Sequence, residues 1–272
     1  MIAIVGQSVI DRIREAGREP VERLGGSPVF AAAALAFAGR TAVILTKGAT
    51  PDLRAPLGRF GFTVAAGDAA SSFVSEHEIY GDGERRHEIM SFGDPFTPAD
   101  VASWMAPHLA GCRAAVCGAQ WRDDFPPETL RALAGGGRTV LLDGQGPSRV
   151  ARLGAVVDQG PLDPAWVEGV TVLKCSEVEA EALFGDRDPA ASGVPVVVVT
   201  RGHVGATVIE PTGTTEVGVD PVLGLADTIG AGDTFLALMA AAMLDGADAV
   251  AAAAMACAGT SAVLRRRLDA LA

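Results

Sequence analysis

The stretch with the clearest chemical content is ADTIGAGDTFLALMAAAM, residues 226–243, in which three small residues precede a strongly apolar helix. Gly230, Ala231 and Gly232 allow the backbone to approach a ligand closely, because they carry little or no side chain. The N–H groups in the first turn of a helix point outward and the helix dipole favours negative charge. We therefore expect an anion site at the start of this helix.

Asp233 falls in the first turn of the same helix and has two interpretations. By itself, a carboxylate at this position simply complements the helix dipole. Beside an anion site it can also act as a general base that takes the proton of a hydroxyl, while backbone N–H groups stabilise charge on phosphoryl oxygens. The composition of the whole stretch favours the second interpretation, which is phosphoryl transfer to a hydroxyl.

Several other catalytic signatures are missing from the chain. It has no G-x-x-x-x-G-K-[ST], so a Walker P-loop is excluded. HEIYG (residues 77–81) and HEIMS (residues 87–91) both lack the second histidine of the zinc-protease motif. There is no G-x-S-x-G elbow of an α/β-hydrolase, and the first apolar run ends in GQS rather than G-x-G-x-x-G, which weakens a dinucleotide-binding interpretation.

The elements that must position these residues alternate between short apolar runs and Ala- and Leu-rich segments. Continuous runs such as VPVVVVT (residues 194–200) are typical of strands buried on both faces of a parallel sheet. Alternation with short links predicts βαβ crossovers, and hence one α/β domain over residues 1–272 with helices covering the sheet. The predicted strands are 2–5, 42–47, 114–117, 139–143, 170–174 and 196–200. The predicted helices are 28–38, 98–109, 127–134, 176–184, 232–244 and 248–264.

Residues 71–91 break this alternation. The segment has no helical period, carries Gly-Asp-Gly at 81–83, and is polar on both flanks. It predicts a β-hairpin outside the main sheet, either a solvated surface hairpin or a lid over a polar ligand. An exposed hairpin edge is also compatible with strand pairing between two copies of the chain, as in a homodimer.

Composition and charge restrict the partners. The chain has 22 Lys and Arg against 33 Asp and Glu, a formal net charge of −11, which argues against nucleic acid or an anionic membrane as a partner. The first residues lack a basic segment and a cleavage site, and no apolar run is long enough to span a bilayer. The four cysteines lack CxxC spacing, which favours free thiols in a reducing cytoplasm.

The chain resembles the ribokinase-like (PfkB) carbohydrate kinases in motifs spread over most of its length. Residues 227–233, DTIGAGD, match the D-T-x-G-A-G-D signature of that family. LGG at 24–26, followed by the small residues up to Gly39, is similar to its di-glycine signature. VG at 5–6 with Asp11 resembles the strand-1 motif. KCSEVEA at 174–180 resembles the N-x-x-E region and VVTRG at 198–202, with Gly205, the nucleotide segment.

The resemblance implies a three-layer αβα fold with a mostly parallel sheet, a small β lid that includes residues 71–91, and an ATP- and Mg²⁺-dependent kinase. Asp233 would be the catalytic base and Gly230, Ala231 and Gly232 the anion hole. Thr200, Gly202, Gly205 and Ser176 would lie along ATP, and Glu179 would organise Mg²⁺ through water. Asp11, Gly25 and Gly26 would hold the hydroxyls of the small-molecule acceptor, with Gln120 and Asp143 as candidates at strand ends. Asp227 and the Ile229 carbonyl would supply part of a K⁺ site.

The departures from the family pattern concern the acceptor. Phe30 stands where the di-glycine motif usually has Asn, and Ser176 replaces the Asn of N-x-x-E. The acceptor therefore need not be ribose-like, and a sugar or a polyol such as inositol is expected. A nucleoside kinase is the alternative, with Phe30 or Phe73 stacking on a base, although either phenylalanine could equally be core. A catalytically weak relative that only binds a nucleotide or metabolite is the other alternative. Asp11, Gln120, Asp143 and Glu179 each also have a plain structural interpretation as a cap, a strand-end polar residue or a solvated carboxylate.

Overall fold

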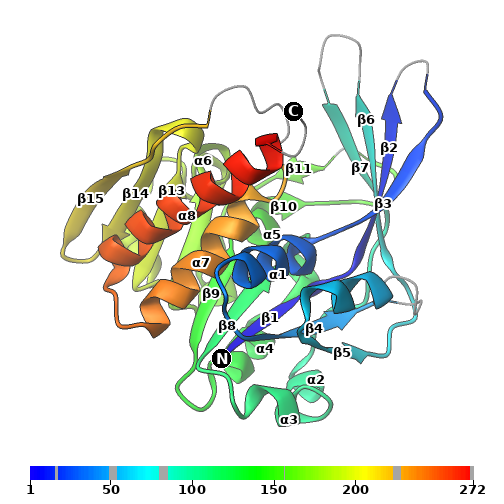
Figure 1. Cartoon of the computed structure of the whole chain (residues 1–272), viewed down its shortest axis with the longest axis horizontal. Helices are drawn as coiled ribbons and strands as arrows, with labels where there is room; N and C mark the ends of the chain where they lie inside the picture. Colours follow the sequence, from blue (N-terminus) through cyan, green and yellow to red (C-terminus); the bar gives the residue numbers. More distant parts are fainter. Residues whose placement is uncertain (16–17, 49–53, 80–84, 156, 223–227, 270–272) are drawn as a thin grey trace.

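The computed structural model describes residues 1–15, 18–48, 54–79, 85–155, 157–222 and 228–269. Its main sheet runs in the order β15-β14-β13-β12-β9-β8-β1-β4-β5 (Figure 1). The strands from β13 to β5 are parallel, whereas β14 and β15 add antiparallel pairs at one edge. The strands are β1 (Ile2–Gln7), β4 (Ala42–Lys47), β5 (Thr63–Gly67), β8 (Ala114–Gly118), β9 (Thr139–Asp143), β12 (Val172–Ser176), β13 (Val196–Thr200), β14 (Gly205–Glu210) and β15 (Gly213–Gly218). The predicted α/β class is confirmed, and the antiparallel edge was not predicted.

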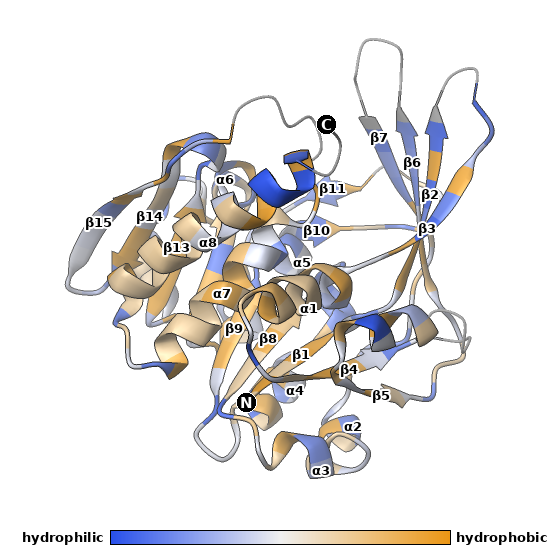
Figure 2. Ribbon diagram, viewed as in Figure 1, coloured by the Kyte–Doolittle hydropathy of each residue, from blue (hydrophilic) through white to orange (hydrophobic). Residues whose placement is uncertain are grey.

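Helices cover both faces of this sheet because alternate side chains of each strand point to opposite faces. Ile2 and Ile4 of β1 pack into a core with α1, α7 and α8, whereas Ala3 and Val5 pack into a second core with α2, α3, α4 and α6. The helices are α1 (Ser27–Phe37), α2 (Pro98–Ala102), α3 (Ala106–Leu109), α4 (Pro127–Ala134), α5 (Gln145–Ser148), α6 (Glu177–Phe184), α7 (Ala231–Leu244) and α8 (Ala249–Asp269). Figure 2 shows that α7 is apolar over most of its length, as a helix buried between α1 and α8 must be.

One predicted helix, residues 98–109, is divided into α2 and α3. Thr97 and Asp100 form a capping box at the start of α2, and Trp104 Nε1 then donates to Asp100 Oδ1 at 2.8 Å. Pro107 has no N–H to donate to a preceding carbonyl, so it is tolerated only in the first turn of a new helix. The chain therefore starts α3 afresh instead of continuing α2.

A second sheet, in the order β3-β2-β6-β7, projects from one end of the main sheet (Figure 1). Its strands are β2 (Val9–Glu15), β3 (Val21–Gly25), β6 (Phe73–Ile79) and β7 (Arg85–Ser91). We call these four strands the lid sheet. The predicted hairpin is confirmed as the antiparallel pair β6–β7, while its predicted turn at 81–83 lies outside the described residues. The sequence interpretation missed β2 and β3.

The two faces of the lid sheet differ in chemistry, as the period of two along a strand requires. One face carries exposed ion pairs, such as Arg12 Nε with Glu22 Oε1 at 2.7 Å. The other face buries Val9, Phe73 and Ile89 close to the main body and continues outward with polar side chains. This second face is the one available to a polar ligand.

A short hairpin from the main body holds one edge of the lid sheet. It consists of β10 (Arg149–Val150) and β11 (Asp158–Gln159), and we call residues 149–155 and 157–159 the clasp. Gly154 N donates to the Ile89 carbonyl at 2.9 Å and Val157 N to the His87 carbonyl at 3.0 Å. Part of the outer edge of β7 is thus already paired within the chain. A homodimer formed through the hairpin stays a prediction. In such a dimer, β7 could pair with a second copy only along the part of its edge that does not bond to the clasp.

In the part of the chain that the structure describes, no helix has both the length and the apolar character that crossing a bilayer requires. Cys112, Cys117, Cys175 and Cys257 are all buried free thiols.

Candidate active site

A buried ion pair lies at the carboxyl ends of β9 and β12. Asp143 and Lys174 face each other in register, and Lys174 Nζ lies 3.0 Å from both Asp143 Oδ1 and Asp143 Oδ2. Burial lowers the pKa of Lys174, but the negative charges of Asp143, Glu179 and Asp233 outweigh burial and raise that pKa above its ordinary value. Lys174 is therefore a permanent cation at the sheet edge where open α/β folds bind their ligands.

Asp233 lies at the third position of α7, partly buried, among the same charges. Burial raises its pKa to about 6, and the charge of Asp143 adds to this, while a hydrogen bond from the Ser27 side chain and the charge of Lys174 oppose it. Ser27 itself fits because β8 ends in Gly118, where a Cβ would lie only 1.9 Å from the Ser27 Cβ. Asp233 is thus a carboxylate with a pKa near neutrality, which is the property required of a general base.

The start of α7 is fixed from two sides. Gly230 adopts φ +76°, and a Cβ there would lie 2.1 Å from Cγ of Phe30, so only glycine fits. Arg267 of α8 donates from Nη1 to the Ile229 carbonyl at 2.8 Å and also lies over the Phe30 ring. Phe30 therefore packs beneath the loop before α7. The Ile229 carbonyl, expected as a K⁺ ligand, is occupied by Arg267, and Asp227 lies outside the described residues.

The first turn of α7 offers fewer N–H groups to an anion than the sequence predicted. Ala231 N donates to the Thr228 carbonyl at 3.0 Å, and the first bond of the helix ladder runs from Thr234 N to Gly230 O at 2.9 Å. The N–H groups of Gly232 and Asp233 lie between these two and have no acceptor within the helix. They are the donors that the first turn can offer to an anion, and we call them the anion cradle.

Gly232 is the position at which this cradle meets the buried cation. A Cβ at Gly232 would lie 2.7 Å from Lys174 Nζ. The absence of a side chain thus lets Lys174 approach the first turn of α7 closely. Two N–H groups and an ammonium group converge on one place, which is suited to a phosphoryl oxygen.

Ser176 and Glu179 form a capping box at the start of α6. Ser176 N donates to Glu179 Oε2 at 2.8 Å, and Glu179 N donates to Ser176 Oγ at 3.3 Å. Burial raises the pKa of Glu179, and the charge of Lys174 opposes that effect. Glu179 is close enough to Lys174 for their charges to interact, whereas Ser176 is not among the residues that line the cavity described next. Both residues are engaged in holding the helix, a role that the S-x-x-E spacing itself indicates.

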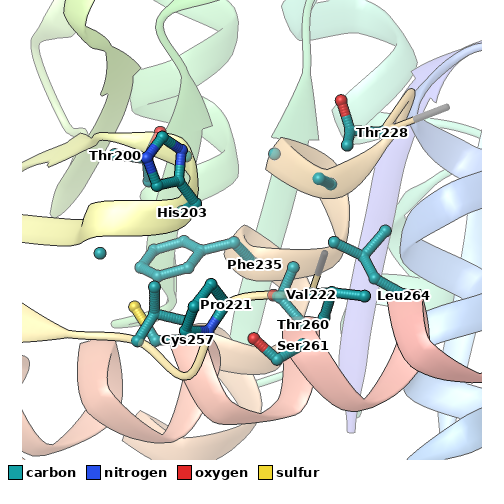
Figure 3. Close-up of a pocket in the computed structure, with 15 residues that line it drawn as sticks. Thr200, His203, Pro221, Val222, Thr228, Phe235, Cys257, Thr260, Ser261 and Leu264 are labelled. Carbon is teal, nitrogen blue, oxygen red and sulfur yellow. The ribbon is translucent and has the colours of Figure 1, made fainter. Parts of the chain in front are cut away.

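A cavity of about 550 Å³ opens beside the start of α7. The predicted nucleotide residues Thr200, Gly202 and Gly205 line it together with Ala231 and Gly232. In Figure 3, Phe235 points into the cavity between the β13–β14 side and α8. The remaining walls are formed by His203, Val219, Pro221, Val222, Thr228, Phe235, Cys257, Thr260, Ser261 and Leu264. Within the described residues, Thr260 Oγ1 is buried without a hydrogen-bond partner, so it is available to a ligand here.

The predicted acceptor residue Asp11 lies in β2 on the polar face of the lid sheet. Ser75 Oγ donates to Asp11 Oδ1 at 2.7 Å, and His77 Nε2 lies 3.6 Å from the same oxygen. Burial raises the pKa of Asp11, but hydrogen bonds with His77 and Ser75 outweigh burial and lower that pKa. Asp11 is therefore charged at neutral pH. A Cβ at Gly25 would lie 2.0 Å from Asp11 Oδ2, so Gly25 makes room for this carboxylate.

His77 and His87 stack across the β6–β7 pair with ring centroids 4.4 Å apart. Burial lowers the pKa of His87 to about 3, and the positive charge of Arg149 contributes. His87 is therefore a neutral ring. Its Nε2 is buried and has no hydrogen-bond partner among the described residues.

Gln120 has mainly a structural role. Its N–H donates to Asp124 and its carbonyl accepts from Arg149 Nη1 at 3.1 Å. Asp124 is fully buried and also accepts from Gln7 Nε2 at 3.1 Å, and burial raises its pKa to about 7. This network fixes the end of β8. Among the described residues, these bonds of Gln120 come from its backbone and not from its side chain.

Comparisons with known proteins agree with this geometry. A pyrophosphate-dependent kinase of the ribokinase family, complexed with a pyrophosphate analogue and myo-inositol, superposes with a TM-score of 0.81 at 21% identity, over 99% of this chain and 100% of that one. Arabidopsis thaliana ribokinase complexed with ribose and ATP gives a TM-score of 0.75 at 16% identity, over 97% and 92%. Residues 156–271 match the model of the pfkB family carbohydrate kinases. The chain has the ribokinase-like fold.

The ribokinase-like chain also has a curated relative. Over 173 residues this chain is 30% identical to the bifunctional protein HldE of Mesorhizobium japonicum. The aligned region covers 57% of this chain and 33% of the relative. The chain thus spans about a third of the length of that relative.

Four site residues of this ribokinase-like protein were not singled out by sequence reasoning. They are Ser27, Lys174, His77 and His87. The first three interact with residues far along the chain, which are Asp233, Asp143 and Asp11 respectively. His87 stacks on His77 of the neighbouring strand. The one local signal was the position of Lys174 at the end of a predicted strand, where ligand-binding residues of parallel sheets gather.

Proposed function

We propose that this ribokinase-like protein transfers the terminal phosphoryl group of a nucleoside triphosphate to a hydroxyl of a small sugar or polyol. The observation that carries the proposal is the position of Asp233. Its neighbours Ala231 and Gly232 line the cavity. Its partner Ser27 lies two residues after Gly25, which adjoins Asp11. A base with a pKa near 6 is thus placed where the donor cavity meets the lid sheet.

In the reaction, Asp233 takes the proton of the acceptor hydroxyl as the new O–P bond forms. The bond between the transferred phosphorus and the bridging oxygen of the donor breaks, and its electron pair stays on the leaving diphosphate. The N–H groups of Gly232 and Asp233 and the ammonium of Lys174 stabilise charge on the transferred group. Asp11 and Ser75 orient the acceptor hydroxyls by hydrogen bonds.

The residues around the cradle suit a Mg²⁺ ion held mainly by phosphates and water. Asp143 is engaged by Lys174 and Gln145 N, and Glu179 Oε2 by Ser176 N, so each carboxylate has limited capacity for direct ligation. In the described part of the chain no group of three potential metal ligands clusters. Glu179 would hold the ion through water, and the ion would supply charge neutralisation of the donor phosphates.

The donor we propose is a nucleotide because of the cavity. Pyrophosphate needs only charged and N–H donors, whereas about 550 Å³ walled by Phe235, Val219, Pro221 and Leu264 suits an apolar ring such as a base. A neighbour of this fold is nevertheless a pyrophosphate-dependent kinase. Pyrophosphate is therefore the alternative donor that the assay must include.

The acceptor we propose is a polyol rather than a nucleoside. Phe73 is fully buried in the lid core, edge-on to Phe92, so it offers no stacking surface. Phe30 packs against Gly230 and has Arg267 over its ring. The groups that face the site from the lid, Asp11, Ser75 and His77, recognise hydroxyls. Nucleoside recognition remains the alternative, because an adenosine kinase from Sinorhizobium meliloti shares the fold with a TM-score of 0.72.

The test is a screen of phosphate transfer from ATP, GTP and pyrophosphate to inositols, hexoses, pentoses and nucleosides. We expect turnover with ATP and a polyol, and its loss in Asp233→Asn with ATP binding retained. If no acceptor is phosphorylated while ATP still binds, the protein is a binding relative rather than a kinase.

A cavity-filling variant tests the donor. Leu264→Trp should raise the KM for ATP about tenfold or more, since overfilling a packed site costs roughly 1–3 kcal/mol. The same substitution at Met255, exposed on α8 and outside the cavity, is the matched control. Equal activity of Leu264→Trp and wild type with pyrophosphate, together with no use of ATP, would refute the nucleotide donor.

A further inference from the structure

Arg149 occupies the junction between the lid sheet and the main body. β9 ends at Asp143, and the short helix α5 follows, closed by a hydrogen bond from Ser148 N to the Gly144 carbonyl at 3.0 Å. Arg149 comes directly after α5. Its Nη1 donates to the carbonyl of Gln120, at the end of the neighbouring strand β8, at 3.1 Å. The guanidinium is therefore held over the carboxyl edge of the sheet by a rigid turn and a strand end.

Four carboxylates act on this guanidinium through their charge, and none of them forms an ion pair with it in the described part of the chain. Burial lowers the pKa of Arg149, and the charges of Glu179, Asp143, Asp124 and Asp233 oppose this. Among the described residues, its one hydrogen bond goes to a neutral carbonyl, although a guanidinium carries five N–H donors. Most of its donors are therefore available to a ligand, and the ligand that matches them is an anion with planar oxygens.

Arg149 is also tied to the lid. It is the first residue of the clasp, which binds the main chain of β7 at His87 and Ile89. Its charge is one cause of the low pKa of His87, so the two side chains are close enough to interact. Because one rigid hairpin bonds to β7 and carries Arg149, the position of the lid and the position of the guanidinium are linked.

Building on the proposed function, we propose that Arg149 is a further catalytic residue that contacts the transferring phosphoryl group, and that the clasp sets its position together with that of the lid. The group in transit lies between the acceptor oxygen on the lid side and the cradle on the α7 side. Arg149 lies between the same two sides. It stays protonated throughout and donates hydrogen bonds to the phosphoryl oxygens, while Asp233 takes the hydroxyl proton and the diphosphate leaves with the electron pair.

The kinetic test uses Arg149→Met and Arg149→Lys in the full chain. For Arg149→Met we expect kcat to fall roughly 10²–10³-fold, the usual loss on removing one donor to developing charge, with ATP affinity and acceptor KM within about threefold. Arg149→Lys should recover part of kcat. Arg152→Met, exposed on the same clasp, is the matched control and should behave as wild type.

A binding test measures the same contact without turnover. ADP with aluminium fluoride, Mg²⁺ and the acceptor mimics the phosphoryl group in transit, and calorimetric titration reports its affinity. We expect wild type and Arg152→Met to bind this complex more tightly than ADP alone, and Arg149→Met to lose the difference.

Each outcome is decisive. An unchanged kcat in Arg149→Met, or aluminium fluoride binding that survives the substitution, would overturn the assignment while the proposed function stands. A rise in acceptor KM alone would instead make Arg149 a reader of an anionic acceptor and would also overturn it. If wild type phosphorylates no acceptor, the proposed function itself fails.

Discussion

Asp233→Asn should abolish catalysis and at the same time stabilise the fold. Burial, with a contribution from Asp143, raises the pKa of this carboxyl from 3.8 to about 6. Each pKa unit corresponds to about 1.4 kcal/mol, so the charged form is disfavoured in the folded protein by about 3 kcal/mol at most. Asparagine has nearly the same shape and no charge, and it can still accept the hydrogen bond from Ser27.

The pH dependence has a definite sign. The native state binds this proton more tightly than the unfolded chain does, so the contribution of Asp233 to the free energy of unfolding falls as the pH rises from 3.8 through 6. The penalty is complete above pH 6 and absent below 3.8. Wild-type turnover should have the opposite dependence and decline below about pH 6, because the base must be ionised.

The measurements are thermal unfolding from pH 4 to pH 8.5 and product release at the same pH values. At pH 8 we expect Asp233→Asn to unfold several degrees higher than wild type, since 1 kcal/mol shifts Tm by roughly 2–4 °C in proteins of this size. The gain should shrink towards zero at pH 4. Turnover at pH 8 should fall about 10²–10⁴-fold.

Asp245→Asn provides the control at the other end of α7. Its carboxylate is exposed and paired with Arg40, whose hydrogen bond lowers the pKa of Asp245, so removing the charge should bring no stabilisation above pH 6 and no loss of turnover. A lower Tm for Asp233→Asn at pH 8, or a gain of equal size at pH 4 and pH 8, would refute the reasoning that the Asp233 carboxylate is held in an unfavourable charged state.

Two further substitutions test the cradle and the lid. Gly232→Ala places a Cβ 2.7 Å from Lys174 Nζ, so the amine must move, and we expect turnover to fall about tenfold or more. Gly58→Ala is the control, because Gly58 has open space around it, and it should leave turnover unchanged. Equal kinetics of the two variants would show that the close approach of Lys174 is dispensable. Phe73→Ala removes a fully buried ring from the lid core and should destabilise by about 3–5 kcal/mol, with faster hydrogen exchange in the lid and a raised acceptor KM. Unchanged exchange in β6 and β7 would contradict that second prediction.

The start of α7 could be predicted from the sequence because its signals are local. Small residues before an apolar run, with an aspartate in the first turn, specify where a helix begins and which groups its end exposes. The parallel strands other than β5 (Thr63–Gly67) were predicted for the same reason, since a short apolar run indicates burial on both faces. The strands β2 and β3 of the lid sheet were harder to predict, because they mix charged and apolar residues without strict alternation and lie outside the α/β pattern.

What surrounds Asp233 was decided only by the tertiary structure. Lys174 meets Asp143 across 31 residues of chain, and Ser27 reaches Asp233 from the first helix. Arg149 has the same residue type as any surface arginine, and only the turn after β9 and the bond to Gln120 bring it over the sheet edge. Residue type and spacing specify which elements form, whereas the side chains that meet at one point depend on the order in which those strands lie in the sheet.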